Sequence, residues 1–350
     1  MQSDSIAGAI LGCAVGDALG LPYEGLSRRR AAGILGEPTR YRFLFGRGMV
    51  SDDSEHTCMV AQAFCASPDD PARFAQQLAA RLRWWLLGIP AGIGFATIRA
   101  ILKLWCGCSP SSSGVYSAGN GPAMRSAVLG AAIDDVNSLR EFVSASTRIT
   151  HTDAKANEGA FAVALGAWCA KRDLDQPDAY FEQLRRCSGE SISDEFSELM
   201  ARVEGSLISQ ETTAAFAENL GCGRAVSGYV YQTVPVVLHA WLCSPRDYRM
   251  AVQAVISCGG DADTLAAIAG AIVGSAVGRS GIPEEWLSGL WEWPRSVHWM
   301  ESLSDAMTSA AAGQKPVQPP RTFPLVGLLR NSIFLSAVLG HGFRRLLPPY

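Results

Sequence analysis

A glycine at every fourth position of the apolar N-terminal segment constrains this fold more than any other sequence feature. These glycines are Gly8, Gly12, Gly16 and Gly20, and a late segment repeats the spacing at Gly270, Gly274 and Gly278. Four-residue spacing places the glycines of one segment on one face of a helix. Each glycine costs roughly 1 kcal/mol of helix propensity, a cost that is understandable where another helix approaches that face closely. We therefore expect the first helix and the late helix to pack together in the core.

Apolar residues recur at three- and four-residue steps along most of the chain. This periodicity predicts helices over residues 6–20, 54–66, 71–87, 121–133, 138–150, 154–171, 176–187, 193–208, 211–220, 227–243, 246–257 and 263–278. No convincing alternating run of β-branched residues interrupts these segments. The 350 residues are 48% apolar and 18% charged, a composition that supports a large buried core. The sequence therefore predicts an all-α fold.

Two long stretches and one short one lack this periodicity. Residues 22–50 and 107–120 are rich in turn-forming residues, which predicts long connections. Residues 309–323 have the composition of a linker. These features predict a domain over residues 1–308, followed by a linker and an apolar helical extension over residues 309–350.

The C-terminal extension is apolar but carries two polar residues in its middle. Arg330 and Asn331 break the apolar run within residues 323–350, so the uninterrupted stretch falls short of the roughly 20 residues that a membrane-spanning helix needs. We expect an amphipathic helix that docks on the body of the protein or on a partner, with a membrane-surface helix as the alternative. Deleting residues 321–350 is then expected to alter solubility or partner binding more than turnover.

Charge and cysteine content exclude several classes of protein. The chain has 30 basic and 33 acidic residues, a net charge of −3, which argues against nucleic-acid binding by bulk charge. Its ten cysteines include no Cys-x-x-Cys pair and have no histidine at metal-ligand spacing, which favours buried thiols over a zinc site. The acidic start Met1–Asp4 does not resemble a secretory signal. We expect a cytoplasmic protein without a nucleic-acid partner.

Two acidic clusters each precede an apolar helical segment. They are Ser51-Asp52-Asp53-Ser54 and Gly259-Gly260-Asp261-Ala262-Asp263-Thr264. Taken singly, each cluster is explained by helix capping, because aspartate caps helices and complements the helix dipole. Taken together, they offer four carboxylates and several hydroxyls, which are the ligands of Mg²⁺, Mn²⁺ or Ca²⁺ rather than of zinc. Four carboxylates in one pocket repel each other unless cations neutralise them, which favours two metal ions over one.

Three further features are candidates for substrate contacts. Residues 119–122, Gly-Asn-Gly-Pro, form a loop before a helix, and free backbone N–H groups there suit a phosphate or diphosphate, although Asn-Gly is also an ordinary turn. His151 lies between two helical segments, where it either contacts a phosphate or ribose or satisfies a helix junction. Glu24 follows the first helix as a candidate general base or metal-linked carboxylate, and the alternative is a solvated loop acid.

Six short motifs follow one another along the chain. They run from Gly12 to Glu24, Ser51 to Ser54, Gly119 to Arg125, Thr150 to Asp153, Thr233 to Pro235 and Gly259 to Thr264. In order and spacing they resemble the ADP-ribosylglycohydrolases, of the dinitrogenase reductase-activating glycohydrolase and ADP-ribosylhydrolase type. The resemblance extends over roughly residues 6–300. Each motif alone is weak, whereas six motifs in order are specific.

The resemblance implies a compact orthogonal all-α bundle with two Mg²⁺ or Mn²⁺ ions in a cleft. It implies six metal ligands: Ser51, Asp52, Asp53, Asp261, Asp263 and Thr264. It implies catalytic carboxylates at Glu24, Asp53 and Asp261. It implies substrate contacts from Ser117, Gly119, Asn120, Gly121 and His151. Three positions depart from the family pattern: Ser51 and Ser54 stand where threonine is usual but keep the donor oxygen, and Ala262 replaces a residue that is often hydroxylated.

The activity implied by the resemblance is hydrolysis of the glycosidic bond between ADP-ribose and a protein side chain. We expect arginine as the linked side chain. Serine-linked ADP-ribose or a free ADP-ribose ester are alternative substrates for the same fold. The partners are then an ADP-ribosylated protein and ADP-ribose. One alternative is a catalytically silent member that binds ADP-ribose or has a structural role. Another, an all-α Mg²⁺ enzyme such as a prenyl synthase, fits the hydrophilic loop 119–121 and the Asp-x-Asp spacing less well.

Overall fold

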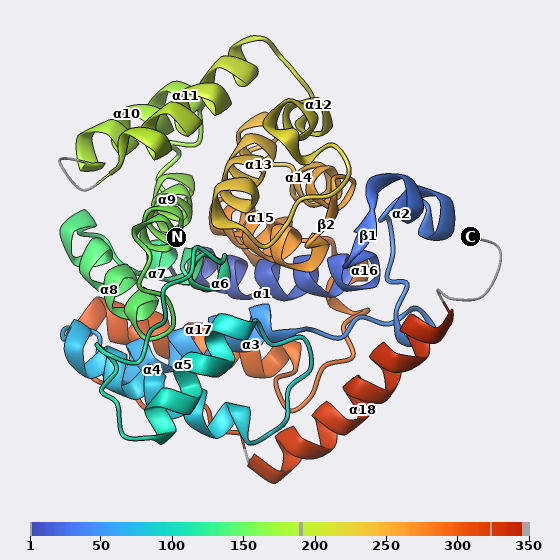
Figure 1. Cartoon of the computed structure of the whole chain (residues 1–350). Helices are drawn as coiled ribbons and strands as arrows, with labels where there is room; N and C mark the ends of the chain where they lie inside the picture. Colours follow the sequence, from blue (N-terminus) through green and yellow to red (C-terminus); the bar gives the residue numbers. More distant parts are fainter. Residues whose placement is uncertain (1, 189–191, 323, 345–350) are drawn as a thin grey trace.

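The computed structural model describes residues 2–188, 192–322 and 324–344, and in these residues nearly all regular structure is helical (Figure 1). The α-helices are α1 (Gln2–Gly20), α2 (Arg28–Leu35), α3 (Asp52–Ala66), α4 (Pro71–Leu86), α5 (Phe95–Trp105), α6 (Gly121–Met124), α7 (Ala127–Ala132), α8 (Val136–Arg148), α9 (Ala154–Ala170), α10 (Pro177–Ser188), α11 (Asp194–Ile208), α12 (Thr213–Ala217), α13 (Val230–Cys243), α14 (Tyr248–Ile256), α15 (Ala262–Val277), α16 (Glu284–Leu287), α17 (Val297–Gly313) and α18 (Pro324–Arg344). The short elements are η1 (Leu21–Tyr23), η2 (Leu44–Gly46), η4 (Glu218–Cys222), η5 (Arg279–Gly281), β1 (Leu26–Ser27) and β2 (Gly259–Gly260). The predicted all-α fold is confirmed.

Helices α1 and α15 form the centre of the molecule and make its most extensive helix–helix contact (Figure 1). They run antiparallel, because Gly8 lies against Gly274 and Gly12 lies against Gly270. A Cβ atom on Gly8 would lie 2.0 Å from the carbonyl oxygen of Gly274, so only hydrogen fits there. The glycine spacing therefore serves close helix packing, and the predicted contact between the two helices is confirmed.

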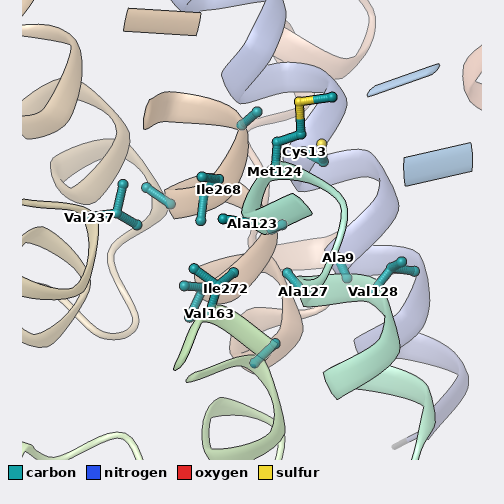
Figure 2. Packing of buried hydrophobic residues seen from close by; sticks show 14 of the residues in the cluster. Ala9, Cys13, Ala123, Met124, Ala127, Val128, Val163, Val237, Ile268 and Ile272 are labelled. Carbon is teal, nitrogen blue, oxygen red and sulfur yellow. The ribbon is translucent and has the colours of Figure 1, made fainter. Parts of the chain in front are cut away.

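Other helices complete the core around this pair. Figure 2 shows Ala9 of α1, Val163 of α9, Val237 of α13 and Ile272 of α15 converging in one buried cluster. Met124 of α6 belongs to the same cluster and also lines a cavity with several acidic residues. On the other side of α1 lie α3 and α17, which also contact each other. The beginning of α3 is thereby held against the central pair.

The two short strands fasten the segment after α1 to the segment before α15. Leu26 pairs with Gly260 and Ser27 pairs with Gly259 in an antiparallel register. The Gly25 amide also donates to the Gly260 carbonyl at 2.8 Å. This pairing brings the chain around residue 24 beside the start of α15, although more than 200 residues separate the two segments in sequence.

Two predicted helices differ from the structure. The segment 121–133 is divided into α6 and α7, because Arg125 leaves the helical conformation (φ −108°, ψ 7°) and is fully buried. Its guanidinium donates to the Gly121 carbonyl at 3.1 Å and to Ser146. The segment predicted over 211–220 is shorter as α12 and passes into the π turn η4, where Gly221 has a φ of +90°.

Regular structure also occurs where none was predicted. Helix α2 and strand β1 lie inside the predicted loop 22–50, and α5 follows α4 without having been predicted. Helix α17 continues to Gly313, so the predicted linker 309–323 begins in the last part of a helix. The loop 107–120 has no helix, as expected. The predicted helix in the C-terminal extension is confirmed as α18.

Helix α1 is long and apolar enough to cross a membrane, and it alone among the described residues has that property. In this fold 94% of its apolar stretch is buried in the protein, which is the environment of a core helix. All ten cysteines are free thiols, and six of them are buried: Cys13, Cys58, Cys65, Cys169, Cys222 and Cys258. The prediction that most thiols are buried is confirmed.

A buried histidine remote from the acidic clusters predicts a pH-dependent stability. His239 of α13 contacts the hydroxyls of Ser206 (Nε2, 3.1 Å) and Thr213 (Nδ1, 3.2 Å) and stacks on Phe216. Burial lowers its pKa to about 4. Between its unfolded and folded pKa values the unfolded chain binds more protons, so this group destabilises the native state as pH falls below about 6.5. From pH 7 to pH 5 it should remove about 2 kcal/mol from the free energy of unfolding.

Urea unfolding of the wild type and of His239→Gln at pH 7 and pH 5 measures this effect. We expect the variant to lose about 2 kcal/mol less than the wild type over this interval, whatever its stability at pH 7. Equal losses in the two proteins would show that His239 is protonated as readily in the native state as in the unfolded chain.

Candidate functional site

The two acidic clusters and the loop before α6 line one cavity of about 620 Å³. Its walls include Glu24, Asp52, Asp261, Asp263 and Thr264, together with the predicted substrate contacts Ser117, Gly119, Asn120, Gly121 and His151. Ser51 and Asp53 lie directly behind this wall at the start of α3. The structure therefore brings together the residues that the sequence singled out, and every segment approaches through a helix start or a glycine-containing loop.

The start of α3 is joined to the start of α15 through Asp53. Ser51 caps α3, accepting from the Asp53 amide at 3.3 Å and donating through Oγ to Asp53 Oδ2 at 3.0 Å. The Thr264 hydroxyl of α15 donates to the same oxygen at 3.2 Å. Asp53 is thus both an ordinary helix-start acid and the link between the two acidic clusters.

A buried carboxylate on α1, Asp17, accepts hydrogen bonds from the start of α3. It accepts from the Ser51 amide at 2.9 Å, from the Ser54 amide at 3.1 Å and from the Ser54 hydroxyl at 2.5 Å. Burial raises the pKa of Asp17 to about 7. Sequence reasoning assigned no role to Asp17, although a lone acid between Gly16 and Ala18 in an apolar helix was a usable signal. Its bond to Ser54 also explains why a serine hydroxyl suffices at that position.

The acidic groups at the site repel one another. Burial raises the pKa of Asp52, Asp53 and Asp263 well above the usual range of aspartate, and neighbouring carboxylates raise it further. For Asp263 these neighbours include Glu24 and Asp261. Buried charges of one sign are stable only when they are protonated or paired with cations. This cluster therefore favours the binding of protons or cations.

Two buried oxygens test whether a divalent cation fits here. Asp53 Oδ1 and Asp263 Oδ1 have no hydrogen-bond partner, although buried carboxylate oxygens normally accept one. Carboxylate and hydroxyl oxygens are the donors that Mg²⁺ and Mn²⁺ prefer. Within the part of the chain that is described, no three His, Cys, Asp or Glu side chains already converge at coordinating positions. The donor atoms are of the kind that a hard cation prefers. In the described residues the side chains line the cavity but are not already arranged at metal-coordinating distances.

The loop before α6 reaches the acidic cluster through Asn120. Its side-chain amide donates to Asp261 Oδ2 at 2.5 Å and to the Thr233 hydroxyl at 3.0 Å. Asn120, predicted as a substrate contact, therefore also orients Asp261. The expectation of free N–H groups in this loop is wrong at two positions, because the Gly119 amide donates to Ser117 Oγ and the Asn120 amide donates to the Gly228 carbonyl.

His151 shapes the same loop. A Cβ atom on Gly119 would lie 3.0 Å from His151 Nε2, and one on Gly121 would lie 3.1 Å from Cε1, so the ring packs against both glycines. Its Nδ1 contacts the Thr150 hydroxyl at 2.9 Å, and that hydroxyl accepts from the buried Arg125 at 2.8 Å. Burial, and then the charge of Arg125, lowers the pKa of His151 to about 3. The ring is neutral near pH 7, so it lines the cavity without adding positive charge.

These features define a class of protein: an all-α protein with an acidic cavity between the starts of two helices and a glycine loop at its side. The sequence model of the ADP-ribosylglycohydrolase family matches residues 1–317. This chain belongs to the ADP-ribosylglycohydrolase family. Membership favours hydrolysis over the prenyl-synthase alternative, and it places α18 outside the matched region.

Individual relatives are similar to this chain over most of their length. The chain is 32% identical over 296 residues to an uncharacterized protein of Archaeoglobus fulgidus, covering 83% of this chain and 92% of the relative. It is 29% identical to the ADP-ribosyl-[dinitrogen reductase] glycohydrolase of Rhodospirillum rubrum, covering 82% and 90%. It is 26% identical to the ADP-ribosylhydrolase ARH3 of Mus musculus, covering 80% and 85%. A solved structure described as an ADP-ribosylglycohydrolase-related protein complex superposes with a TM-score of 0.63 at 27% identity, covering 89% of this chain and 99% of that one.

Proposed function

We propose that this protein is a divalent-metal-dependent hydrolase that removes ADP-ribose from arginine side chains of proteins. Family membership supports ADP-ribosylglycohydrolase activity. The observation that carries the metal dependence is the pair of buried carboxylate oxygens without partners, Asp53 Oδ1 and Asp263 Oδ1, in a cluster of acids that repel one another.

Two Mg²⁺ or Mn²⁺ ions are the proposed cofactors, because one divalent ion balances only part of the four carboxylates of the two clusters. The proposed ligands are Ser51, Asp52, Asp53, Asp261, Asp263 and Thr264. When bound, such ions neutralise the carboxylates and polarise the oxygen atoms of water or sugar hydroxyls.

The remaining chemistry rests with residues of the chain. Glu24 is exposed and lines the cavity, and we assign to its carboxylate the role of taking a proton from an attacking water. The water oxygen bonds to the anomeric carbon of ribose, the carbon–nitrogen bond to the guanidine breaks, and that nitrogen gains a proton. To Asp53 and Asp261 we assign the negative charge that favours oxocarbenium character at that carbon. Asn120 holds Asp261 in place at 2.5 Å.

Electrostatics favours arginine as the linked side chain. The charged residues among the described lining of the cavity are four carboxylates, Glu24, Asp52, Asp261 and Asp263. Because the proposed metal ions neutralise Asp52, Asp261 and Asp263, Glu24 is the carboxylate of this set that remains to attract a guanidinium group, whereas a neutral serine linkage gains nothing from it. The neutral His151 and the loop 119–121 line the side of the cavity that we assign to the diphosphate.

Release of ADP-ribose from arginine-modified and serine-modified proteins tests this proposal. We expect release from the arginine linkage with Mg²⁺ or Mn²⁺, loss of at least about 100-fold in rate with EDTA, and recovery when metal is added back. Release from the serine linkage alone would show that serine, not arginine, is the linked side chain of the substrate. Release that continues in EDTA would contradict the proposed metal dependence. A protein that releases nothing but is stabilised by ADP-ribose in a thermal melt is the silent binding protein.

The cellular compartment is also a proposal. Ten free thiols suit the reducing conditions of the cytoplasm, where disulfides are rare.

A further inference from the structure

The C-terminal helix α18 packs with its polar residues inward. Arg330 and Asn331 are 2% and 4% exposed, whereas Leu329 and Phe343 of the same helix are 59% and 67% exposed. Burying a guanidinium and an amide is unfavourable unless both find specific partners. The partners of these side chains therefore show what the helix does.

Arg330 is anchored beside the start of α3. Its Nε and Nη2 atoms donate to the two carboxylate oxygens of Glu292 at 3.0 Å and 2.7 Å, and Nη2 also donates to the Val50 carbonyl at 2.5 Å. Glu292 accepts from the Val50 amide at 3.2 Å, so both backbone groups of Val50 are held. Val50 directly precedes Ser51, the cap of α3 and the neighbour of Asp52. A bidentate buried ion pair fixes geometry more strictly than a surface pair.

Asn331 holds a second loop of the cavity. Its side-chain amide donates to the Gly88 carbonyl at 2.8 Å. Gly88 lies in the connection between α4 and α5, in which Gly92 and Gly94 line the acidic cavity. A Cβ atom on Gly92 would lie 3.9 Å from Asp52 Oδ1, which places this loop beside the acidic cluster.

The same helix touches the segment that leads to Glu24. Phe334 is buried in a small cluster with Leu21, Phe43 and Met49. Two turns further along α18, His341 Nε2 lies 3.2 Å from the Pro22 carbonyl. Leu21 and Pro22 belong to η1, which ends directly before Glu24. Three separate segments that supply cavity residues therefore meet on one helix.

We propose that α18 is a brace for the catalytic site, with Arg330 and Asn331 as positioning residues that act through Val50 and Gly88. The family model ends at residue 317, so this brace is a feature of the chain outside the matched domain. It replaces the expectation that removal of residues 321–350 affects solubility more than turnover. The catalytic part of this inference rests on the proposed function, whereas the mechanical part does not.

Two full-length variants test the brace. The double variant Arg330→Met with Glu292→Gln removes both charges together, so that no buried charge is left unpaired. Asn331→Ala removes one hydrogen bond from the other loop. Leu329→Ala, on the exposed face of the same helix, is the matched control. Hydrogen exchange of peptides covering residues 47–54 and 86–94, titration with Mg²⁺ alone, and kcat and KM for ADP-ribosylated protein are measured on each.

We expect faster exchange, by about 10-fold or more, over 47–54 in the double variant and over 86–94 in Asn331→Ala. In both variants we expect kcat to fall by about 10- to 100-fold, while KM stays within about twofold of the wild type. The Mg²⁺ concentration at the midpoint of the titration should rise by about 10- to 100-fold. Exchange over 262–277 should remain that of the wild type, because α15 does not depend on these contacts. Leu329→Ala should match the wild type in every readout.

Several results would overturn the proposal. Unchanged exchange over both loops shows that α18 does not hold them. Faster exchange with unchanged kcat and Mg²⁺ midpoint shows a purely structural contact, and an equal effect of Leu329→Ala shows that no specific side chain is involved. If the wild type itself releases no ADP-ribose, the proposed function is wrong. Hydrogen exchange and Mg²⁺ titration of the same variants then show whether α18 holds the two loops.

Discussion

Replacing Asp263 with asparagine is expected to lower the rate of ADP-ribose release by at least about 100-fold, the largest functional effect we foresee. The side chain keeps its size but loses a negative charge at a site where one carboxylate oxygen has no partner. Without divalent metal the same variant should melt higher than the wild type at pH 8, by about 2 °C, because one of several repelling buried charges is gone. Loss of activity together with gain of stability distinguishes a functional acid from a structural one.

Asp247→Asn is the matched control for this substitution. Asp247 is also an aspartate at a helix start, where it caps α14 by accepting from the Met250 amide at 2.9 Å. Asparagine caps helices equally well, so neither activity nor melting temperature should change. An Asp263→Asn protein with wild-type turnover would refute the assignment of Asp263 to the metal site.

Replacing Gly16 with alanine is expected to cost about 3 kcal/mol or more of the free energy of unfolding. The new Cβ atom would lie 2.0 Å from the carbonyl oxygen of Ala266 and 2.6 Å from its carbon, both backbone atoms of α15. Backbone atoms within a helix do not move aside as a flexible side chain does, so the central helix pair must separate. Urea unfolding, followed by far-ultraviolet circular dichroism, measures the loss.

Gly205→Ala tests whether this cost comes from packing. Gly205 lies on the exposed face of α11, and a Cβ atom there would have no neighbour within 4 Å. The same substitution should be neutral or stabilise the protein by up to about 1 kcal/mol through helix propensity. Equal effects of the two substitutions would mean that α1 and α15 do not approach each other as closely as the structure shows.

Much of the fold could be predicted because its determinants are local. Periodicity identified α4, α8, α9 and α11 closely, and the glycine spacing identified the central helix pair before any contact was known. Helix α2 was missed because three consecutive arginines and a glycine give its short sequence little apolar periodicity. The interruption between α6 and α7 was missed because its cause, the buried Arg125, depends on partners on α8 and at Thr150.

Some features of the candidate site could likewise be predicted from local sequence, whereas others depend on the tertiary structure. Asp52, Asp53, Asp261 and Asp263 stand at helix starts, a position that sequence reveals, because capping and the helix dipole are properties of a few adjacent residues. That the two clusters share one cavity follows from the glycine faces of α1 and α15 and from the pairing of β1 with β2. The hydrogen bond from Asn120 to Asp261 joins residues 141 positions apart and has no local signature.

By itself the sequence determined that this chain is helical, that its first and late helices pack closely, and that its acids gather at helix starts, since periodicity, the missing Cβ atom and helix capping act over a few residues. Only the tertiary structure decided that Asp17 supports the start of α3, and that α18 turns Arg330 inward to hold Val50, 280 residues away in sequence. A buried charge is placed by partners that lie close in space, and those partners exist only after the chain has folded.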